Sequence, residues 1–376
     1  MSVPRATYRV QLTPDFGFDA TAAIVPYLAR LGVSHLYFSP YLQAAPGSRH
    51  GYDVVDHSHV NAELGGEAGH ARLVLALGAA GLGQVLDIVP NHMAASGRRN
   101  RWWWDVLKHG PDSRFAAYFD VDWNPPDQKL RGLILAPVLG DHYGRELEAG
   151  NLRLERDGDE LLLRYHEHEF PIDPGSVLEL FGGPLTGAQV ADVTADPDRL
   201  DELLERQHYR LARWRVAAEE LDYRRFFDVN ELVAIRTEEP EVFARTHELV
   251  LGWLRAGVVA GLRVDHPDGL RDPHAYFERL AEAGAAWVLA EKILAPGEEL
   301  PERWPVAGTT GYEFLNLVLG LFVDPAAGPT LRRVFARFAG IDQPWPDVAA
   351  AGRRFVMDRM LAADLRRLVA LFEKVV

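Results

Sequence analysis

The chain contains no cysteine. This absence excludes disulfide bonds, thiol nucleophiles and cysteine-ligated metal sites. No run of eighteen apolar residues occurs, so no helix is expected to span a membrane. The first residues, MSVPRATYRVQL, lack the charged-then-apolar pattern of a signal peptide. From these absences we expect a cytoplasmic protein without a membrane partner.

An excess of positive charge is also missing. Lys and Arg number 40 against 54 Asp and Glu, which gives a formal charge of −14. Phosphate backbones and anionic lipids do not favour an acidic surface, so no nucleic-acid partner is expected and a neutral substrate fits better. The remaining composition, 48% hydrophobic and 25% charged, is that of an ordinary globular protein.

Short apolar runs alternate with helical patterns in two parts of the chain, which predicts βαβ units and a parallel sheet. Between them, residues 94–221 are irregular and rich in Trp, Pro and Gly, with a helical spacing at 198–221. A structureless loop of this length is implausible in a compact domain, so we interpret it as an inserted subdomain. The six expected strands are residues 8–12, 33–39, 84–89, 261–264, 287–290 and 305–307.

These elements predict an α/β fold of the (β/α)8 TIM-barrel type. The chain of 376 residues exceeds the roughly 250 of a plain barrel, which leaves room for the insertion. Only about six strands are found, so the barrel is expected to be incomplete, with the last barrel strands and a C-terminal β domain absent. The expected parts are residues 1–93 (strands one to three), 94–222 (the inserted subdomain) and 223–376 (strands four to six and the helices that follow).

The polar residues that could take part in catalysis lie where predicted strands end, which is where a barrel places its active site. Cleavage of an acetal between sugars needs two carboxyl groups, one protonated and one ionised. Asp265 and Glu291 are separated by one helix and one strand, so they are expected at the ends of neighbouring strands. Arg263 precedes Asp265 by two positions and should point to the same side and hold that carboxylate ionised. His92 and His266 are placed to hydrogen-bond sugar hydroxyls.

Each of these residues also has a structural interpretation. A lone carboxylate near a strand end is more often a helix cap, and Asp87 is expected to support loop backbone rather than chemistry. Residues 102–104, three tryptophans, are either a sugar-stacking platform or core of the insertion. No spacing demands a metal, although a structural calcium remains open. Three other histidines are expected to be solvated: His57, His59 and His70.

The ordered set of motifs resembles the α-amylase clan of glycoside hydrolases, and within it the maltooligosyl trehalose synthase family. Four clan motifs are matched in order: Gly51-Tyr52-Asp53, DIVPNH at 87–92, GLRVDH at 261–266, and Glu291. Similarity to the synthases lies in TYRVQL at 7–12, YFSPYLQAAPGSRHGYDVVDH at 37–57, RVDHPDGLRDP at 263–273, EKIL at 291–294 and GTTGYEFLN at 308–316.

The resemblance implies an isomerase that needs no cofactor and acts on maltooligosaccharides. The reducing-end α-1,4 bond would become an α,α-1,1 (trehalose) linkage by retaining intramolecular transglucosylation, with Asp265 as nucleophile and Glu291 as proton donor. Asp87 and Asn91 would support the site. The residues expected to bind substrate are Tyr52, Asp53, His92, Arg263 and His266.

Three alternatives remain open at this point. Two are other clan activities, an α-amylase-like hydrolase and a 4-α-glucanotransferase, which differ in what accepts the glycosyl group. The third is a catalytically incomplete glucan-binding fragment, because the clan's third carboxylate, an Asp after the seventh strand, is not found in the sequence. The sequence does not define an oligomeric state or a preferred chain length.

Overall fold

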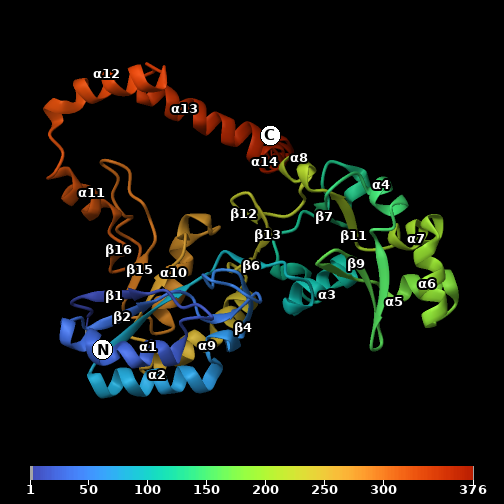
Figure 1. Cartoon of the computed structure of the whole chain (residues 1–376), viewed down its shortest axis with the longest axis horizontal. Coiled ribbons are helices and arrows are strands. Elements are labelled where there is room, and N and C mark those ends of the chain that lie inside the picture. Colours follow the sequence, from blue (N-terminus) through green and yellow to red (C-terminus); the bar gives the residue numbers. More distant parts are fainter. Residues whose placement is uncertain (1–2, 376) are drawn as a thin grey trace.

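The computed structural model describes residues 3–375, and its centre is one curled sheet of parallel strands (Figure 1). The strands run in the order β1-β2-β5-β14-β15-β16, and each neighbouring pair is parallel. This arrangement is an incomplete (β/α) barrel, as predicted. The strand bounds are β1 (Thr7–Val10), β2 (His35–Phe38), β5 (Gly83–Ile88), β14 (Gly261–Val264), β15 (Val288–Ala290) and β16 (Gly308–Thr309).

Four helices cover the convex side of this sheet and form one hydrophobic core with it. The first helix ends at Gly32, whose left-handed backbone (φ 91°) suits a glycine at the helix C-terminus. Gly17 is its N-cap, and Tyr27 and Leu31 are exposed, because the helix buries the face that begins at Phe18. The helix bounds are α1 (Phe18–Leu31), α2 (Gly66–Ala80), α9 (Pro240–Arg255) and α10 (Pro273–Glu282).

A two-stranded ribbon leads from the sheet to the insertion, which Figure 1 shows on the right. In this ribbon β6 (His92–Ala94) pairs with β13 (Val229–Ala234), and β12 (Arg225–Phe226) adds to its edge. On the sheet side, β3 (Leu42–Ala44) and β4 (Val54–Val60) form a second antiparallel pair.

The insertion has a hydrophobic core of its own. We propose this part as the inserted subdomain expected at 94–222. Trp103 and Trp104 are buried there, so these two side chains are core rather than a sugar platform. Its elements are α3 (Arg101–His109), β7 (Ile134–Leu139), α4 (Tyr143–Glu148), β8 (Arg153–Asp157), β9 (Glu160–Tyr165), β10 (His168–Pro171), α5 (Pro174–Phe181), α6 (Gly187–Ala195), α7 (Pro197–Leu204), β11 (Tyr209–Arg213) and α8 (Ala217–Glu220).

Two expectations from the sequence are wrong: the helix over 198–221 and the solvent exposure of His57 and His70. The helix predicted over 198–221 is interrupted: α7 ends at Leu204, and α-helix resumes only in the short α8. Residues 209–213 form β11, which pairs in parallel with β7. The buried side chains of Tyr209 and Leu211 alternate as a strand requires, and backbone pairing overrides the helical spacing. His57 and His70 are buried rather than solvated, packed against Trp102 and Trp253 respectively.

The carboxyl group of Asp222 is buried in the insertion. Its only hydrogen-bond donor among the described side-chain contacts is the amide of Leu135, at 3.0 and 3.1 Å from the two oxygens. Burial raises the pKa of Asp222 to about 7, against the lowering effect of this hydrogen bond. The folded state therefore favours the neutral acid over the carboxylate.

The raised pKa predicts how stability changes with pH. The stabilisation from the neutral Asp222 is complete below about pH 3.8 and is lost as the pH rises towards 7. In Asp222→Asn this loss should disappear, which raises the free energy of unfolding at pH 8 relative to the parent by an amount on the order of 4 kcal/mol. Urea unfolding at pH 4 and pH 8 measures the difference. A stability gap between the two proteins that is the same at both pH values would contradict the prediction.

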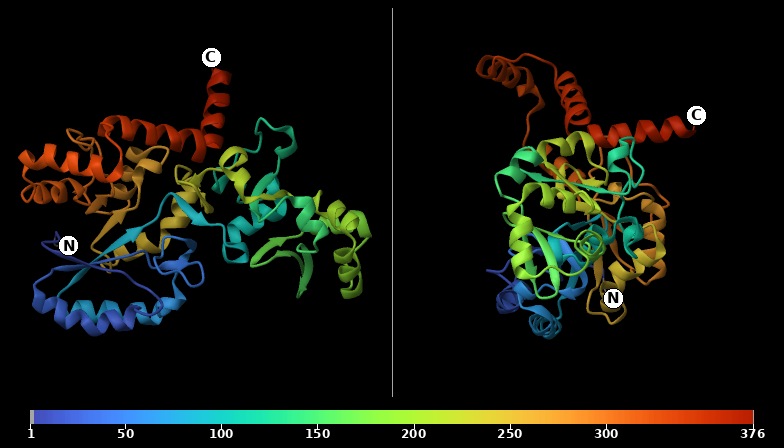
Figure 2. Two further views of the ribbon diagram at one scale, coloured as in Figure 1. Left: turned by 45° about the horizontal axis from the view of Figure 1, so that its top comes forward. Right: turned by 90° about the vertical axis from the view of Figure 1, so that its right-hand side faces the viewer.

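An arm of four helices follows the sheet and crosses the molecule, as the red segments of Figure 2 show. The last helix contacts the insertion through the guanidinium of Arg366, 3.6 Å from Glu219. In residues 3–375 no single helix has the length and apolar composition to cross a membrane. Helices 312–320 and 325–339 have that length and composition only when taken together, and this pair is bent by 79°. The arm consists of α11 (Tyr312–Gly320), α12 (Gly328–Ala339), α13 (Trp345–Phe355) and α14 (Ala362–Val375).

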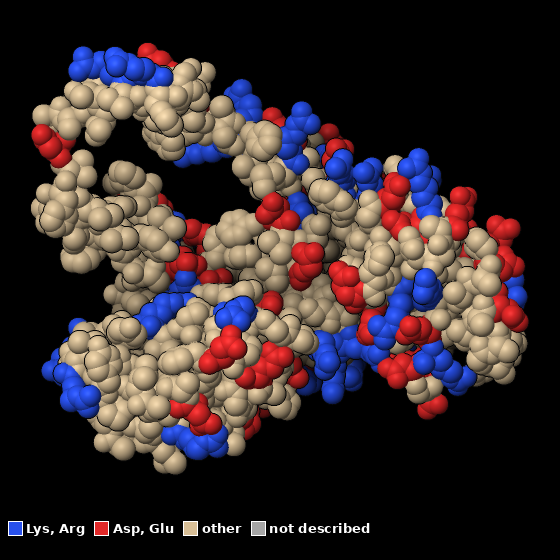
Figure 3. Space-filling view, viewed as in Figure 1, with Lys and Arg blue, Asp and Glu red and all other residues tan. Residues whose placement is uncertain are grey.

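Much of the arm's apolar surface faces solvent, and Figure 3 shows an open gap between the arm and the rest of the molecule. The accessible surface is 20689 Å², whereas a compact monomer of 42.0 kDa exposes about 15,000 Å². Phe322 and Phe338 are 83% and 91% exposed. Apolar patches of this extent are typical of interaction surfaces or of aggregation.

We expect the isolated chain to self-associate through this face. Sedimentation velocity should show an average mass that rises with protein concentration. Phe335→Ser combined with Phe338→Ser should weaken the association, while Arg333→Ser, a charged position of the same helix, should not. A concentration-independent monomer in the unmodified chain would show that the exposed face does not mediate association.

Candidate active site

The concave side of the sheet carries a row of polar side chains. Side chains alternate between the two faces along each strand. Val10 and Phe38 point into the helix-covered core, and the residues directly before them, Arg9 and Tyr37, point to the concave side. Arg263 on β14 lies directly opposite Asp87 on β5 in the parallel register. Pairing of neighbouring strands therefore brings together residues that are far apart in the sequence.

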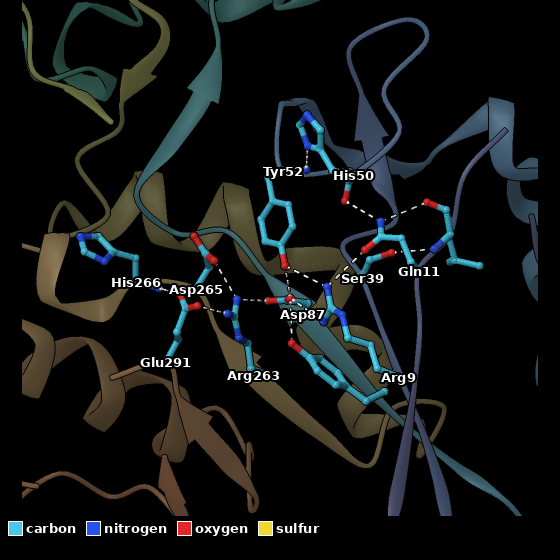
Figure 4. A network of polar contacts seen from close by, with 12 residues as sticks. Arg9, Gln11, Ser39, His50, Tyr52, Asp87, Arg263, Asp265, His266 and Glu291 are labelled. Atoms are coloured by element: carbon cyan, nitrogen blue, oxygen red, sulfur yellow. Dashed lines mark hydrogen bonds and ion pairs between the residues drawn. The ribbon is translucent and has the colours of Figure 1, made fainter. Parts of the chain in front are cut away.

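Arg263 is the centre of this row (Figure 4). Its Nη1 atom lies 2.7 Å from Asp87 Oδ1 and 2.7 Å from Asp265 Oδ1, and its Nη2 atom lies 2.5 Å from Glu291 Oε1. The Arg263 side chain is 7% exposed. One buried guanidinium thus holds three carboxylates, a rigid and directional arrangement that its planar donors favour.

Asp265 and Glu291 occupy equivalent places on neighbouring strands. Each follows the last paired residue of its strand: the amide of Asp265 donates to Ile88 O at 2.9 Å, and that of Glu291 to Val264 O at 3.0 Å. Their contact with the same guanidinium keeps the two carboxyl groups close together. Retaining glycosidases need about 5–5.5 Å between their carboxyl groups, and this arrangement is compatible with that separation.

Burial dominates the electrostatics of Asp265. It raises the pKa of Asp265 to about 7; Arg263 lowers this pKa, while the charges of Asp87 and Glu291 raise it. Burial also raises the pKa of Asp87, again against Arg263. Arg263 therefore favours the ionised form of Asp265, while burial and the two neighbouring carboxylates oppose its ionisation.

The Gly51-Tyr52-Asp53 motif enters the site through its tyrosine. Tyr52 Oη donates to Asp87 Oδ2 at 2.7 Å and accepts from Arg9 at 3.1 Å. Asp53 points elsewhere and accepts from Ser48 within its own loop. Gly51 has a positive φ of 81°, and a Cβ there would lie 2.1 Å from the Pro40 carbonyl oxygen, so only glycine fits this turn.

Asn91 and His266 fix the backbone around the two carboxylates. His266 adopts a left-handed conformation (φ 40°), uncommon outside glycine, and its amide donates to Glu291 Oε2 at 3.1 Å. The Asn91 side-chain amide donates to the carbonyls of Asp265, at 3.3 Å, and His266, at 2.6 Å. Asn91 thereby stabilises the turn that orients Glu291.

His92 is buried beneath the loop that carries Tyr52. Its Nε2 atom lies 3.1 Å from the Tyr52 carbonyl oxygen, and burial lowers the pKa of His92 to about 4. A neutral ring with Nε2 protonated satisfies this contact. The ring of Phe226 packs against it with centroids 4.2 Å apart.

Several side chains of the site were not found from the sequence. Arg9 and Tyr37 both contact Asp87 Oδ2, at 3.4 and 3.0 Å, and a polar residue in each of two apolar strands was their only signal. Phe226 and Phe227 pack on the His266 ring at 5.4 and 5.0 Å between centroids. They lie just after the insertion, and no local pattern relates them to His266.

The described part of the chain contains no group of three His, Asp or Glu side chains arranged to hold a metal ion. The carboxylates on the concave side contact guanidinium and tyrosine hydroxyl groups. The arrangement therefore consists of two adjacent carboxyl groups, a shared cation and a tyrosine hydroxyl, a set suited to acid and nucleophilic chemistry at an acetal carbon.

Fold and site together define an α-amylase-type catalytic domain. Residues 21–144 match the family described as the catalytic domain of alpha amylase.

Within this class the chain is homologous over nearly its whole length to maltooligosyl trehalose synthases. It is 42% identical to a Mycobacterium tuberculosis (strain ATCC 25618 / H37Rv) protein named as such a synthase, over 96% of the chain and 44% of that protein. The solved maltooligosyltrehalose synthase from Arthrobacter ramosus is 43% identical, with a TM-score of 0.85 over 97% of the chain and 44% of that structure. The DSM5389 glycosyltrehalose synthase is 36% identical, with a TM-score of 0.87 over 98% and 48%. The chain thus spans less than half the length of each.

Proposed function

We propose that the site converts the reducing-end α-1,4 bond of a maltooligosaccharide into an α,α-1,1 linkage. The observation that carries this proposal is the contact of one guanidinium, that of Arg263, with both Asp265 and Glu291 at neighbouring strand ends. Two carboxyl groups so placed suit a retaining reaction at an anomeric carbon. The similarity to proteins named as trehalose-forming synthases supports the choice of product.

In the proposed first step the Asp265 carboxylate attacks C1 of the penultimate glucosyl unit. The bond from C1 to O4 of the reducing-end glucose breaks, and Glu291 gives its proton to O4. In the second step Glu291 removes the proton from the anomeric hydroxyl of the freed glucose, whose O1 attacks C1 and displaces Asp265. No water is consumed, so the reaction is an isomerisation.

Arg263 and Tyr52 have positioning roles in this proposal. Arg263 orients the nucleophile and the acid relative to each other. Tyr52 hydrogen-bonds Asp87, which in turn contacts Arg263 and fixes the position of its guanidinium. His266 supplies an amide that orients Glu291. We further propose that the His266 ring, half-buried beside Phe227, contacts the sugar, while His92 and Asp53 support the loops around it.

Incubation of the chain with maltopentaose tests the proposal, with reducing ends and anomeric NMR signals followed together. The proposed activity predicts loss of reducing ends, an α,α-1,1 signal and unchanged chain length. An increase in reducing ends would indicate an α-amylase-like hydrolase. Redistribution among chain lengths with conserved reducing ends would indicate a 4-α-glucanotransferase. No reaction in a folded sample would contradict catalysis by this chain.

A further inference from the structure

A groove of about 1180 Å³ is lined mostly by the insertion, with Ala45 and Pro46 from the sheet side, and by none of the residues of the carboxylate site. Its lining combines the apolar residues Ile134 to Val138 of β7 with a set of polar residues, here called the rim. The rim includes Ser96, Arg98, Arg99 and Glu231. This volume exceeds the 300–1,000 Å³ usual for drug-sized ligands, so an extended ligand fits it better than a single sugar.

The charges of the rim largely compensate one another. Arg98 contacts Asp157 at 2.6 Å and Glu169 at 3.0 Å, and Arg164 contacts Glu169 at 2.8 Å. A phosphate or sulfate group would have to compete with these carboxylates for the arginine side chains. The same groups can exchange hydrogen bonds with neutral hydroxyls without giving up their ion pairs, which favours a neutral, polyhydroxylated ligand.

An exposed aromatic ring completes the lining. Trp214 is 53% exposed, and the Arg215 guanidinium lies 5.2 Å from its ring centroid. The apolar face of a pyranose ring can pack on such a surface while its hydroxyls point to the polar rim. Apolar walls with a few convergent polar groups are the usual make-up of a ligand site.

The groove begins within reach of the catalytic site. Ser96 on its rim is four residues from His92, which contacts the Tyr52 backbone beside the carboxylates. Four extended residues span at most about 14 Å, the length of a few glucosyl units. A glucan whose reducing end lies between Asp265 and Glu291 can therefore extend into the insertion.

We propose that this groove binds an α-1,4-glucan several glucosyl units away from the bond that is rearranged. The inference rests on the proposed function for its choice of glucan, and on the groove's own lining for its choice of a neutral oligosaccharide. It makes Trp214 and Arg99 determinants of affinity for long substrates, with no contact to the reacting atoms.

Binding measured without turnover tests this inference. In the Glu291→Gln background, calorimetric titration with maltoheptaose is compared with titration with maltose. Trp214→Ala should weaken maltoheptaose binding about tenfold and leave maltose binding unchanged, and Arg99→Ala, at an exposed position, should weaken it in the same direction. Tyr27→Ala, an exposed aromatic on α1 remote from the groove, is the matched control and should have no effect.

The outcomes separate the groove from the proposed function. Unchanged maltoheptaose affinity in both folded groove variants would overturn the inference, and equal binding of cellohexaose would overturn its α-1,4 specificity. Wild-type chain that binds maltoheptaose through Trp214 but forms no trehalose linkage would retain the groove and reject the proposed reaction. Formation of the trehalose linkage by a chain whose groove variants bind maltoheptaose like the parent would support the proposed reaction and reject the groove.

Discussion

Asp265→Asn is expected to abolish conversion of maltopentaose, with a fall in kcat of at least about 10⁴-fold, because the amide cannot form the glycosyl ester. The same substitution removes an ionisable group but keeps the shape and a hydrogen-bond acceptor for Arg263, so folding should be retained. Initial rates by NMR, with circular dichroism of both proteins, measure the effect. Conversion at more than a hundredth of the parent rate would reject Asp265 as nucleophile.

The rate should also depend on pH through the same residue. The nucleophile must be ionised, and burial raises the pKa of Asp265 to about 7. Below this pH the carboxyl group is increasingly protonated, so kcat/KM should fall about tenfold per pH unit on the acid side. A rate that stays constant from pH 7 down to pH 5 would contradict the raised pKa.

Arg263→Met is expected to lower the free energy of unfolding by about 3–5 kcal/mol. The substitution leaves Asp87 and Asp265 buried without the cation that both contact at 2.7 Å. Urea unfolding at pH 8, where these groups are charged in the unfolded chain, measures the loss.

A double-mutant comparison separates charge from packing in this result. Asp87→Asn in the Arg263→Met background removes one of the stranded carboxylates and should recover part of the stability. Lys108→Met, which breaks a partly exposed pair with Glu160, should cost at most about 1 kcal/mol and is the matched control. A cost for Arg263→Met no larger than this control would show that the buried network does not stabilise the fold.

The six strands of the sheet could be predicted from the sequence because local apolar patterns specify them. The pairing of Asp265 with Glu291 followed from the same reasoning, since parallel neighbouring strands end at one edge. Strand bounds were less accurate: the sixth strand is Gly308–Thr309 rather than 305–307, because two paired residues carry little pattern. The homology to the synthases confirms the resemblance that these motifs indicated.

Other features depend on contacts that no local pattern contains. The local pattern of β11 predicts a helix, but the segment forms a strand because it pairs with β7, some 75 positions earlier in the chain. The raised pKa of Asp265 follows first from burial and then from the neighbouring charges of Asp87 and Glu291, which only the folded sheet determines. Phe226 and Phe227 reach His266 because the ribbon of β6 and β13 returns the chain from the insertion to the site.

The most direct test of the central claim is to trap the glycosyl ester. Glu291→Gln is incubated with α-maltotriosyl fluoride, whose fluoride leaves without a proton donor, and the protein is analysed by intact and peptide mass spectrometry. We predict a mass increase of one maltotriosyl unit on the peptide that contains Asp265, and none in the Glu291→Gln/Asp265→Asn double variant. An adduct on another residue, or none in a folded sample, would contradict the assignment of Asp265 and Glu291 as the reacting pair.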